Sequence, residues 1–425
     1  MTNEPPMRNY LLFILVSFST GLWAQYQGPI APISSGYGAK GPNAVEVINL
    51  PNDRFPQKDI SVFYPQGTTS PVPTIFFSHG YGGNDTVRYI ETLRHLASRG
   101  YVAVFVPYST IGITIPERYL TLFEGFTKAA RTLPTIIDTT RVGFYGHSFG
   151  GGATPRVAYR AFRENNWGVN GKFIFCSAPW YSFELGTTNL PNFPTDCNML
   201  TVLYDDDFTN DHRMGMDIFN NIVINDSIKD CLMVFSDTIS GYLYEANHNL
   251  PGETGNGELD ALDYYVTFRL LDALSDYTFT GDLAAKEVAL GNGSAAQIDM
   301  GGQLSPLNSI KVPSPVYAQS LYQFQCNATL NERQAFCPTA LSIDQQLADE
   351  LDVQVFPNPT DGTLTIATKN DFREMEVVIH TMMRQKIFTQ HDPNTLIDIR
   401  NLPVGTYTIR ITLDERIYTQ RIVKE

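Results

Sequence analysis

Charged residues are scarce in this sequence, and basic residues are the scarcer kind. Only 17% of the 425 residues are charged, with 30 Lys and Arg against 44 Asp and Glu, which gives a formal net charge of -14. A chain with this balance repels phosphate backbones and anionic lipid surfaces, so we expect no nucleic-acid partner. Hydrophobic residues make up 43% of the chain. That share is enough for a full core and a second domain, and it excludes an intrinsically disordered protein.

Long apolar runs are also missing, apart from one near the N-terminus. Residues 10–18 are too few to span a bilayer, but they follow Arg8 and precede small residues, as the apolar region of an export signal does. We predict a signal peptide over residues 1–24, cleaved after Ala24, and no transmembrane segment. A buried N-terminal helix is the alternative.

Cysteine is rare as well, with five residues and no CxxC motif, so neither a zinc site nor a redox motif is supported. In an exported chain, five cysteines leave at least one unpaired. Cys326 and Cys337 flank a short loop, and we expect them to form a disulfide. Cys197 and Cys231 each begin a predicted strand and would pair if those strands were neighbours. Cys176 would then be a small buried hydrophobic residue.

What the sequence does contain, over residues 73–237, is an alternation of short apolar runs with stretches of helical period. The runs include TIFFSHG, YVAVFVPY, RVGFYGHS, KFIFCSAPW, MLTVLYDDD and CLMVFSD. They are continuously apolar, which is typical of strands covered on both faces of a parallel sheet. Upstream, AVEVINLP and KDISVFYP predict an opening hairpin. We therefore predict an α/β domain over residues 25–304, with helices on both faces of a mostly parallel sheet.

The character of the sequence changes after about Val353, where alternating strands and turns begin. Residues 353–425 carry 9 Lys and Arg and 9 Asp and Glu, so the whole net charge of -14 lies upstream. We predict a separate small β-sandwich domain over residues 353–425. Residues 305–352 are predicted to be an extension and linker.

One turn of the first domain has the pattern of a nucleophile. The motif GHSFG, residues 146–150, lies between a predicted strand and a predicted helix, the context in which a G-x-S-x-G turn exposes its serine. Glycines are needed there because neighbouring side chains would collide, and the following helix N-terminus favours developing negative charge. Ser148 is therefore the candidate nucleophile. A plain glycine-rich turn between strand and helix is the alternative.

A second glycine-rich motif, HGYGG at residues 79–83, ends an earlier predicted strand. Together the two motifs resemble the α/β-hydrolase superfamily, over roughly residues 44–301. The resemblance implies an α/β-hydrolase fold and a catalytic triad in the chain order serine, acid, histidine. It also implies an oxyanion hole formed by the backbone amides of Tyr81 and Phe149.

Under that chain order, His248 is the candidate base, with an ordinary loop histidine as the alternative. The other histidines precede or flank the serine, follow the acidic cluster too closely, or lie in the C-terminal domain; they are His79, His95, His147, His212, His380 and His391. The strand-end pattern of the family favours Asp207 as the acid, with Asp206 as the alternative. Asp205 to Asp207, with Asp211, are also a candidate calcium site, although they lack EF-hand spacing.

Within the superfamily, the sequence is most similar to dienelactone-hydrolase-like esterases and to bacterial cutinases and polyester hydrolases. The similarity lies in the glycines at 150–152, in Tyr81 and in SAPW at 177–180. It implies that Tyr81 and Trp180 line an acyl groove, whereas the alternative for Trp180 is a core aromatic. The sequence departs from those enzymes at His147, where they often carry tryptophan, and at Phe149, where methionine is usual.

The C-terminal domain has a resemblance of its own. VFPNPTDGTLTI, LPVGTYTIRI and the terminal RIVKE resemble the sorting domain of the type IX secretion system of Bacteroidetes. The resemblance implies that residues 353–425 engage that machinery and that the protein is released or attached to the cell surface. An adhesive or carbohydrate-binding β-sandwich is the alternative.

These features predict a secreted serine hydrolase of carboxylic esters, including polyester or cutin-like substrates, which needs no cofactor or metal and acts as a monomer. Ser148, Asp207 and His248 would be catalytic, and Tyr81 and Trp180 would bind substrate. A serine peptidase with the same triad is one alternative. An inactive surface binding or adhesion protein on a hydrolase scaffold is the other.

Overall fold

The computed structural model describes residues 26–185, 190–252, 259–310 and 322, and then 353–358, 360–368, 373–381, 386–391, 396–413 and 416–424. The predicted signal peptide, the predicted Cys326–Cys337 pair and most of the predicted linker lie outside these residues.

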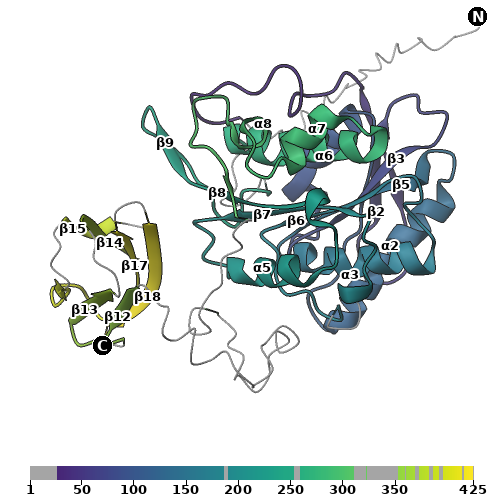
Figure 1. The fold of residues 1–425 in the computed structure, drawn as a ribbon. Coiled ribbons are helices and arrows are strands. Elements are labelled where there is room, and N and C mark those ends of the chain that lie inside the picture. The colour runs from purple at the N-terminus through teal and green to yellow at the C-terminus, as the bar shows by residue number, and fades with distance from the viewer. Residues whose placement is uncertain are drawn as a thin grey trace, which may run out of the picture.

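A nine-stranded sheet forms the centre of the first part of the chain (Figure 1). In sheet order its strands are β1 (Val45–Leu50), β2 (Ile60–Pro65), β4 (Val102–Phe105), β3 (Val72–Ser78), β5 (Ile137–His147), β6 (Lys172–Ser177), β7 (Asn198–Tyr204), β8 (Lys229–Val234) and β11 (Asn308–Ser309). Strands β4, β3, β5, β6, β7 and β8 run parallel. Strands β1 and β2 form the predicted antiparallel hairpin. The predicted α/β class is therefore confirmed.

Helices cover both faces of this sheet (Figure 1). On one face lie α2 (Ile115–Thr132), α3 (Phe149–Glu164) and α5 (His212–Asn221), and their apolar side chains share one buried cluster. On the other face α1 (Ile90–Ser98), α6 (Arg269–Thr280) and α7 (Leu283–Leu290) share a second cluster. Further elements among the described residues are α8 (Ala295–Ile298), a π-helix at Asp263–Phe268, 3-10 turns at Thr86–Tyr89, Leu190–Asn192 and Asp226–Ile228, and a hairpin of β9 (Asp237–Ile239) and β10 (Tyr242–Tyr244).

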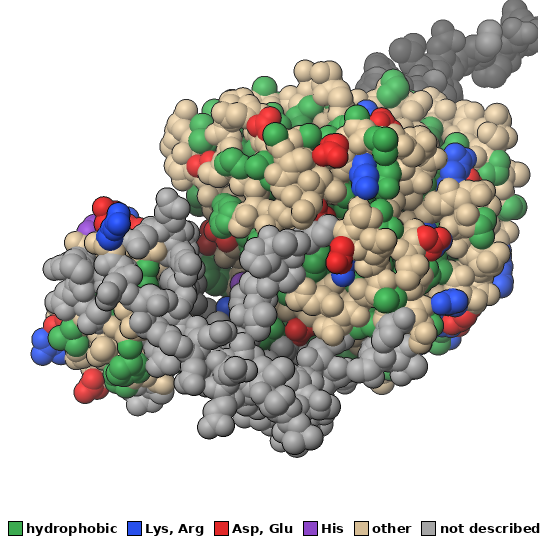
Figure 2. All heavy atoms as spheres, in the orientation of Figure 1, with side chains coloured by type: hydrophobic (Ala, Val, Ile, Leu, Met, Phe, Trp, Pro, Cys, Tyr) green, Lys and Arg blue, Asp and Glu red, His purple; other side chains and the backbone are tan. Residues whose placement is uncertain are grey.

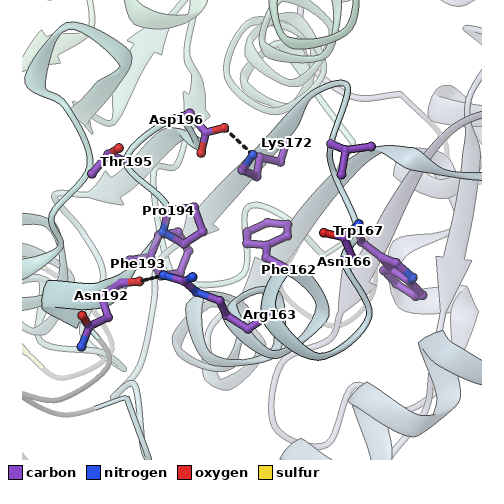
Figure 3. Close-up of a pocket in the computed structure, with 11 residues that line it drawn as sticks. Phe162, Arg163, Asn166, Trp167, Lys172, Asn192, Phe193, Pro194, Thr195 and Asp196 are labelled. Atoms are coloured by element: carbon purple, nitrogen blue, oxygen red, sulfur yellow. Dashed lines mark hydrogen bonds and ion pairs between the residues drawn. The ribbon is translucent and has the colours of Figure 1, made fainter.

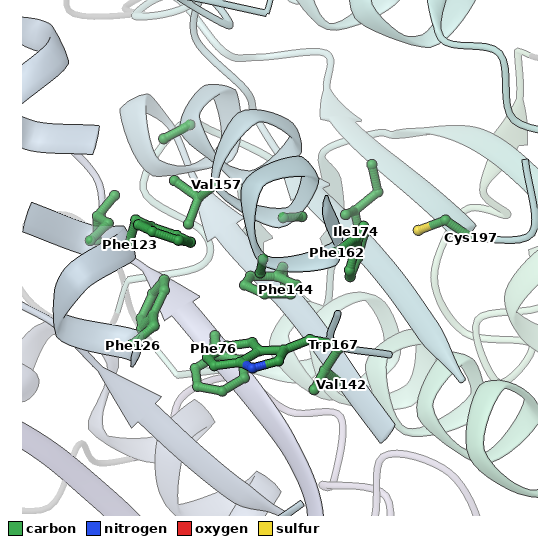
Figure 4. Packing of buried hydrophobic residues seen from close by; sticks show 14 of the residues in the cluster. Phe76, Phe123, Phe126, Val142, Phe144, Val157, Phe162, Trp167, Ile174 and Cys197 are labelled. Carbon is green, nitrogen blue, oxygen red and sulfur yellow. The ribbon is translucent and has the colours of Figure 1, made fainter. Parts of the chain in front are cut away.

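The central strand β3 shows why the strands are continuously apolar in sequence. Successive side chains of a strand point to opposite faces. Phe76 accordingly belongs to the cluster shared by α2, α3 and α5, which we call the α2–α3 cluster. Ile75 and Phe77 belong to the cluster on the opposite face. Phe76 stacks on Phe144, with ring centroids 5.2 Å apart, and on Trp167, at 4.8 Å (Figure 4). Both faces of the strand are therefore buried, as the pattern predicted.

The described residues of the C-terminal part form two antiparallel sheets. One contains β12 (Val353–Phe356), β13 (Thr363–Thr368) and β16 (Leu396–Asp398), and the other contains β15 (Lys386–His391), β14 (Met375–Thr381), β17 (Gly405–Leu413) and β18 (Arg416–Lys424). Alternate residues of the strands are buried: Ile409 and Ile411 of β17 enter a core shared by both sheets, whereas Arg410 between them is exposed. The alternation read from the sequence therefore corresponds to two sheets packed on each other.

The predicted pairing of Cys197 with Cys231 is wrong, because both thiols are free and buried, as is that of Cys176. Strands β7 and β8 are neighbours, as the prediction required, but their register places Cys231 opposite Thr201. Cys197 lies four residues before that position, about 13 Å along the strand. A disulfide requires Cα atoms within about 7 Å, so this register excludes the bond. Cys176 is a buried small residue, as predicted.

The surface of the described residues carries charge of both signs. In the view of Figure 2, basic and acidic side chains are dispersed over the larger part of the molecule and do not gather in a single patch. None of the helices in the described ranges has the length and hydropathy that a membrane span needs.

Candidate functional site

Ser148 lies on a tight turn between β5, which ends at His147, and α3, which begins at Phe149. Its backbone has φ 57° and ψ -123°, a conformation that residues other than glycine rarely adopt. The carbonyl of Ser148 accepts N–H bonds from Trp180 (2.8 Å) and Gly152 (3.0 Å), and its own N–H donates to the carbonyl of Ser177 (3.0 Å). Both the helix and the loop after β6 therefore hold the strained turn.

The glycines on either side of Ser148 allow the turn to pack directly on neighbouring chain segments. A Cβ atom at Gly150 would lie 2.0 Å from the carbonyl oxygen of Ser78, at the end of β3. A Cβ atom at Gly146 would lie 2.2 Å from the hydroxyl of Thr154. Any side chain at these two positions would push the serine away from the sheet, which is the reason for the G-x-S-x-G pattern.

His248 joins this serine to Asp207 through two hydrogen bonds. Nε2 of His248 is 2.9 Å from Oγ of Ser148, and Nδ1 is 2.8 Å from Oδ2 of Asp207. Because the carboxylate only accepts, the imidazole proton lies on Nδ1, and Nε2 can accept the proton of the serine hydroxyl. Oδ1 of Asp207 accepts the N–H groups of Thr209 and Asn210, at 2.9 and 2.8 Å, which fixes the carboxylate. The arrangement can transfer a proton from serine to histidine.

Asp206 occupies a different position from Asp207. Its carboxylate accepts the hydroxyl of Ser236 at 2.5 Å, its N–H donates to the carbonyl of Ala246, and it forms a β-bridge with Asn247. Asp206 therefore attaches the end of β7 to the loop that carries His248. Within the part of the chain that the structure describes, no group of three or more His, Cys, Asp or Glu side chains is placed to hold a metal. The calcium alternative gains no support from this geometry.

The HGYGG turn lies against the serine. A Cβ atom at Gly80 would lie 3.2 Å from Cβ of Ser148, and Tyr81 follows directly. Phe149 is the first residue of α3, where backbone N–H groups have no acceptor within the helix and carry the positive end of its dipole. The two amides predicted as an oxyanion hole therefore belong to two segments that adjoin Ser148, the HGYGG turn and the first residue of α3.

Arg118 of α2 connects the side chains of these two residues, a role that no sequence signal indicated. Its guanidinium lies over the rings of Tyr81 and Phe149, 5.2 and 5.5 Å from their centroids. One of its nitrogens donates to the carbonyl of Thr110, which also accepts the hydroxyl of Tyr81. Cation-π contacts of this kind stabilise by about 0.5 to 2 kcal/mol. Arg118 thus holds the ring of Tyr81, which is 62% exposed, against the turn.

The backbone of Trp180 lies beside the serine, because its N–H donates to the carbonyl of Ser148. Its indole ring is partly exposed and packs against the α2–α3 cluster, with an edge contact to Tyr181 at 5.9 Å between centroids. The backbone of Trp180 therefore adjoins the serine, while its ring contacts the core and remains partly exposed.

His79, the first residue of the HGYGG turn, is a buried neutral histidine. Its ring stacks on Tyr108 with centroids 3.9 Å apart. Nε2 accepts the N–H of Tyr108, and Nδ1 donates to the carbonyl of Gly80. Burial lowers the pKa of His79 to about 3. A protonated ring would direct an N–H at the N–H of Tyr108, so the turn requires the neutral form.

We predict that acid destabilises the fold through His79. Histidine in an unfolded chain has a pKa near 6.5, so between about pH 6.5 and about pH 3 the unfolded state binds a proton that the folded state does not. The free energy of unfolding should therefore fall as the pH falls through this window, by up to about 1.4 kcal/mol per pH unit from this residue. Urea unfolding at several pH values measures the slope. A His79→Gln variant should show a shallower slope, and an unchanged slope would contradict the assignment.

A cavity of about 490 Å³ lies near the start of β6 (Figure 3). Its lining includes Arg163, which donates to the carbonyl of Asn192, and Lys172, which pairs with Asp196 at 2.6 Å. Lys172 begins β6 and Asp196 precedes β7, whereas Ser148 follows the end of β5. Since these strands are parallel, the cavity lies at their N-terminal ends and Ser148 lies at their C-terminal ends.

Comparison with known proteins identifies the C-terminal part. Residues 354–425 match the family described as the secretion system C-terminal sorting domain. This match confirms the predicted type IX sorting domain and implies that the protein is secreted or attached to the cell surface. A search of curated proteins finds no match to the chain.

Proposed function

We propose that this protein is a secreted serine hydrolase that cleaves carboxylic esters through an acyl-enzyme intermediate. The observation that carries the proposal is the pair of hydrogen bonds that joins Asp207 to His248 and His248 to Ser148, at 2.8 and 2.9 Å. Buried carboxylate, imidazole and hydroxyl in this order are the arrangement that activates a serine. The strained turn before a helix N-terminus supports the resemblance to the α/β-hydrolase superfamily.

In the proposed acylation step, Oγ of Ser148 attacks the ester carbonyl carbon while its proton passes to Nε2 of His248. Asp207 stabilises the imidazolium that forms. The carbonyl electron pair moves onto oxygen, where the amides of Tyr81 and Phe149 donate to it. When the intermediate collapses, the alkoxy oxygen leaves with the proton from His248. The alcohol departs, and Ser148 carries the acyl group.

Deacylation repeats these steps with water. His248 takes a proton from a water molecule, whose oxygen attacks the acyl carbon. Oγ of Ser148 then leaves and recovers the proton from His248. The products are a carboxylic acid and the free enzyme, so the cycle needs neither a redox partner nor a metal.

The surroundings of the serine support an apolar or aromatic acyl group, as in polyester or cutin-like substrates. Tyr81 is 62% exposed, and its hydroxyl donates to the carbonyl of Thr110. The next residue, Ile111, is 85% exposed. Trp180 adds a partly exposed indole. Aromatic faces of this kind contribute about 0.5 to 1.5 kcal/mol per contact beyond the area they bury. We propose that Tyr81 and Trp180 contact the acyl chain.

The test is to assay the secreted protein on nitrophenyl esters of increasing acyl length, on a polyester film and on matched nitroanilide peptides. Hydrolysis of the esters, with longer acyl chains preferred, is the expected result. Hydrolysis of the peptides with no ester preference would favour the peptidase alternative. A protein that cleaves none of these substrates and is not labelled by a fluorophosphonate would contradict the proposal.

We predict that a chain ending at Leu351 keeps its hydrolase activity but is no longer exported from the native host. The residues of the sorting domain share a core of their own, separate from the two clusters around the nine-stranded sheet. Immunoblots of culture medium and periplasm would locate the shortened protein, and ester assays on the purified protein would measure its activity. Unchanged export of the shortened chain would contradict the prediction.

A further inference from the structure

Three segments of the candidate site are joined by a chain of hydrogen bonds through two buried side chains, Tyr89 and His147. The N–H of Gly80, in the HGYGG turn, donates to the hydroxyl of Tyr89 at 3.0 Å. That hydroxyl is 3.0 Å from Nδ1 of His147, the last residue of β5. Nε2 of His147 is 2.7 Å from the backbone carbonyl of His248. The chain therefore runs from the oxyanion turn, past the serine, to the loop of the candidate base.

The proton positions in this chain have one consistent assignment. A carbonyl only accepts, so Nε2 of His147 carries the hydrogen and donates it to His248. Nδ1 of the neutral ring then accepts, and the hydroxyl of Tyr89 donates to it. The hydroxyl oxygen is left to accept the N–H of Gly80. Every polar group of the chain is satisfied in this one direction, and reversing any bond would leave two donors or two acceptors facing each other.

Burial makes the arrangement rigid. Tyr89 is 0% exposed and His147 is 2% exposed. Burial, together with the neighbouring His248, lowers the pKa of His147 well below its ordinary value, which keeps the ring neutral. The ring of Tyr89 also packs on Phe77 of β3, with centroids 4.7 Å apart. Removing one member would leave a buried polar group without a partner, at a cost of about 1 to 3 kcal/mol.

We propose that His147 is a positioning residue that holds the main chain of His248 in register with Ser148 and, through Tyr89, fixes the oxyanion turn. The proposal rests on the proposed ester hydrolysis. The hydrogen bond of His147 goes to the backbone carbonyl of His248, and its ring also lies against the imidazole of His248, with centroids 4.9 Å apart. Its effect comes from geometry, because a displacement of about 1 Å in a catalytic group costs about 100-fold in rate. The side chain of Asp207 fixes the tautomer of His248, and His147 fixes where its loop lies.

The test compares His147→Leu, His147→Gln and Tyr89→Phe in the full chain. We expect His147→Leu to lower kcat about 100-fold with KM within about threefold, because ground-state contacts are unaffected. A glutamine amide can donate to the carbonyl of His248 and accept from Tyr89, so His147→Gln should recover at least about tenfold of the lost kcat. Because the two residues act as one unit, Tyr89→Phe should add little to His147→Leu in the double variant.

Tyr101→Phe is the matched control. Tyr101 is also buried, and its hydroxyl donates to Asp276 of α6, which lies outside the candidate site. This variant should lower the melting temperature as Tyr89→Phe does but leave kcat unchanged. Equal kcat in all three test variants and the wild type would contradict the positioning role and leave ester hydrolysis intact.

A second measurement keeps the two proposals separate. In ¹⁵N-histidine spectra of the Ser148→Ala protein, the ring signals of His248 should shift when Tyr89→Phe is added, a change that leaves the ring of His147 against that of His248. If the wild type cleaves no ester, the proposed function fails and these spectra alone decide the positioning role. Unchanged His248 signals would then contradict it.

Discussion

Replacing Ser148 with alanine should lower kcat on nitrophenyl esters by about six orders of magnitude. Members of a triad act as a unit, so without Oγ His248 has no hydroxyl proton to accept and Asp207 has no imidazolium to stabilise. Activity above the uncatalysed rate would come from the oxyanion amides and from binding. Alanine keeps the Cβ atom of serine, and therefore leaves the strain of the φ 57° backbone as it is. The melting temperature should consequently change little.

Stopped assays at high enzyme concentration would measure the residual rate, and a fluorophosphonate probe would report the loss of the nucleophile. Ser275→Ala is the matched control. Ser275 is a fully buried serine of α6, so its replacement is structurally comparable. We expect Ser275→Ala to keep wild-type kcat. A Ser148→Ala protein within tenfold of wild type would exclude Ser148 as the nucleophile.

Replacing Asp207 with asparagine should lower kcat by about 10⁴-fold, whereas Asp206→Asn should lower it less than about tenfold. An amide at Asp207 can donate its own hydrogen to Nδ1 of His248, which forces the imidazole proton onto Nε2 and blocks proton transfer from the serine. Asp206 binds Ser236 rather than the imidazole. Its replacement should therefore loosen the loop without changing the tautomer.

The two variants form a controlled pair, since they make the same chemical change at adjacent residues. Steady-state kinetics across the pH range would compare them, because loss of the correct tautomer lowers kcat at every pH. Equal losses in the two variants would mean that the carboxylates share the role. A larger loss in Asp206→Asn would reassign the acid.

The parts of the molecule that could be predicted from sequence are those with local signals. Strand β3 is buried on both faces, so its apolar run is continuous, and the parallel sheet followed from such runs. The turn at Ser148 was predictable because the close approach of Ser78 and Thr154 permits only glycine at its two ends. His248 followed from chain order, and the structure brings it to the serine.

What could not be predicted depends on register and on contacts between distant segments. Cys197 directly precedes β7 and Cys231 is the third residue of the adjacent β8, and the register between these strands places the two cysteines four residues apart. Tyr89 and His147 are 58 residues apart, and nothing in either local sequence indicates that a hydroxyl and an imidazole meet. Periodicity predicts which face of an element is buried. It contains no information on which polar groups will face one another there.

The three free thiols in the part of the chain that the structure describes must be buried before they are oxidised in the newly exported protein. Outside the cytoplasm the surroundings are oxidising, and a thiol exposed in an unfolded chain can be captured as a mixed or non-native disulfide. In the folded protein Cys176, Cys197 and Cys231 are each no more than 1% exposed, and burial raises the pKa of all three. In the folded chain these cysteines are therefore neither accessible to oxidants nor ionised to the reactive thiolate. The sheet that buries these sulfurs must form before an oxidant reaches them. Slow folding would therefore increase the fraction of exported protein that carries a mixed or non-native disulfide.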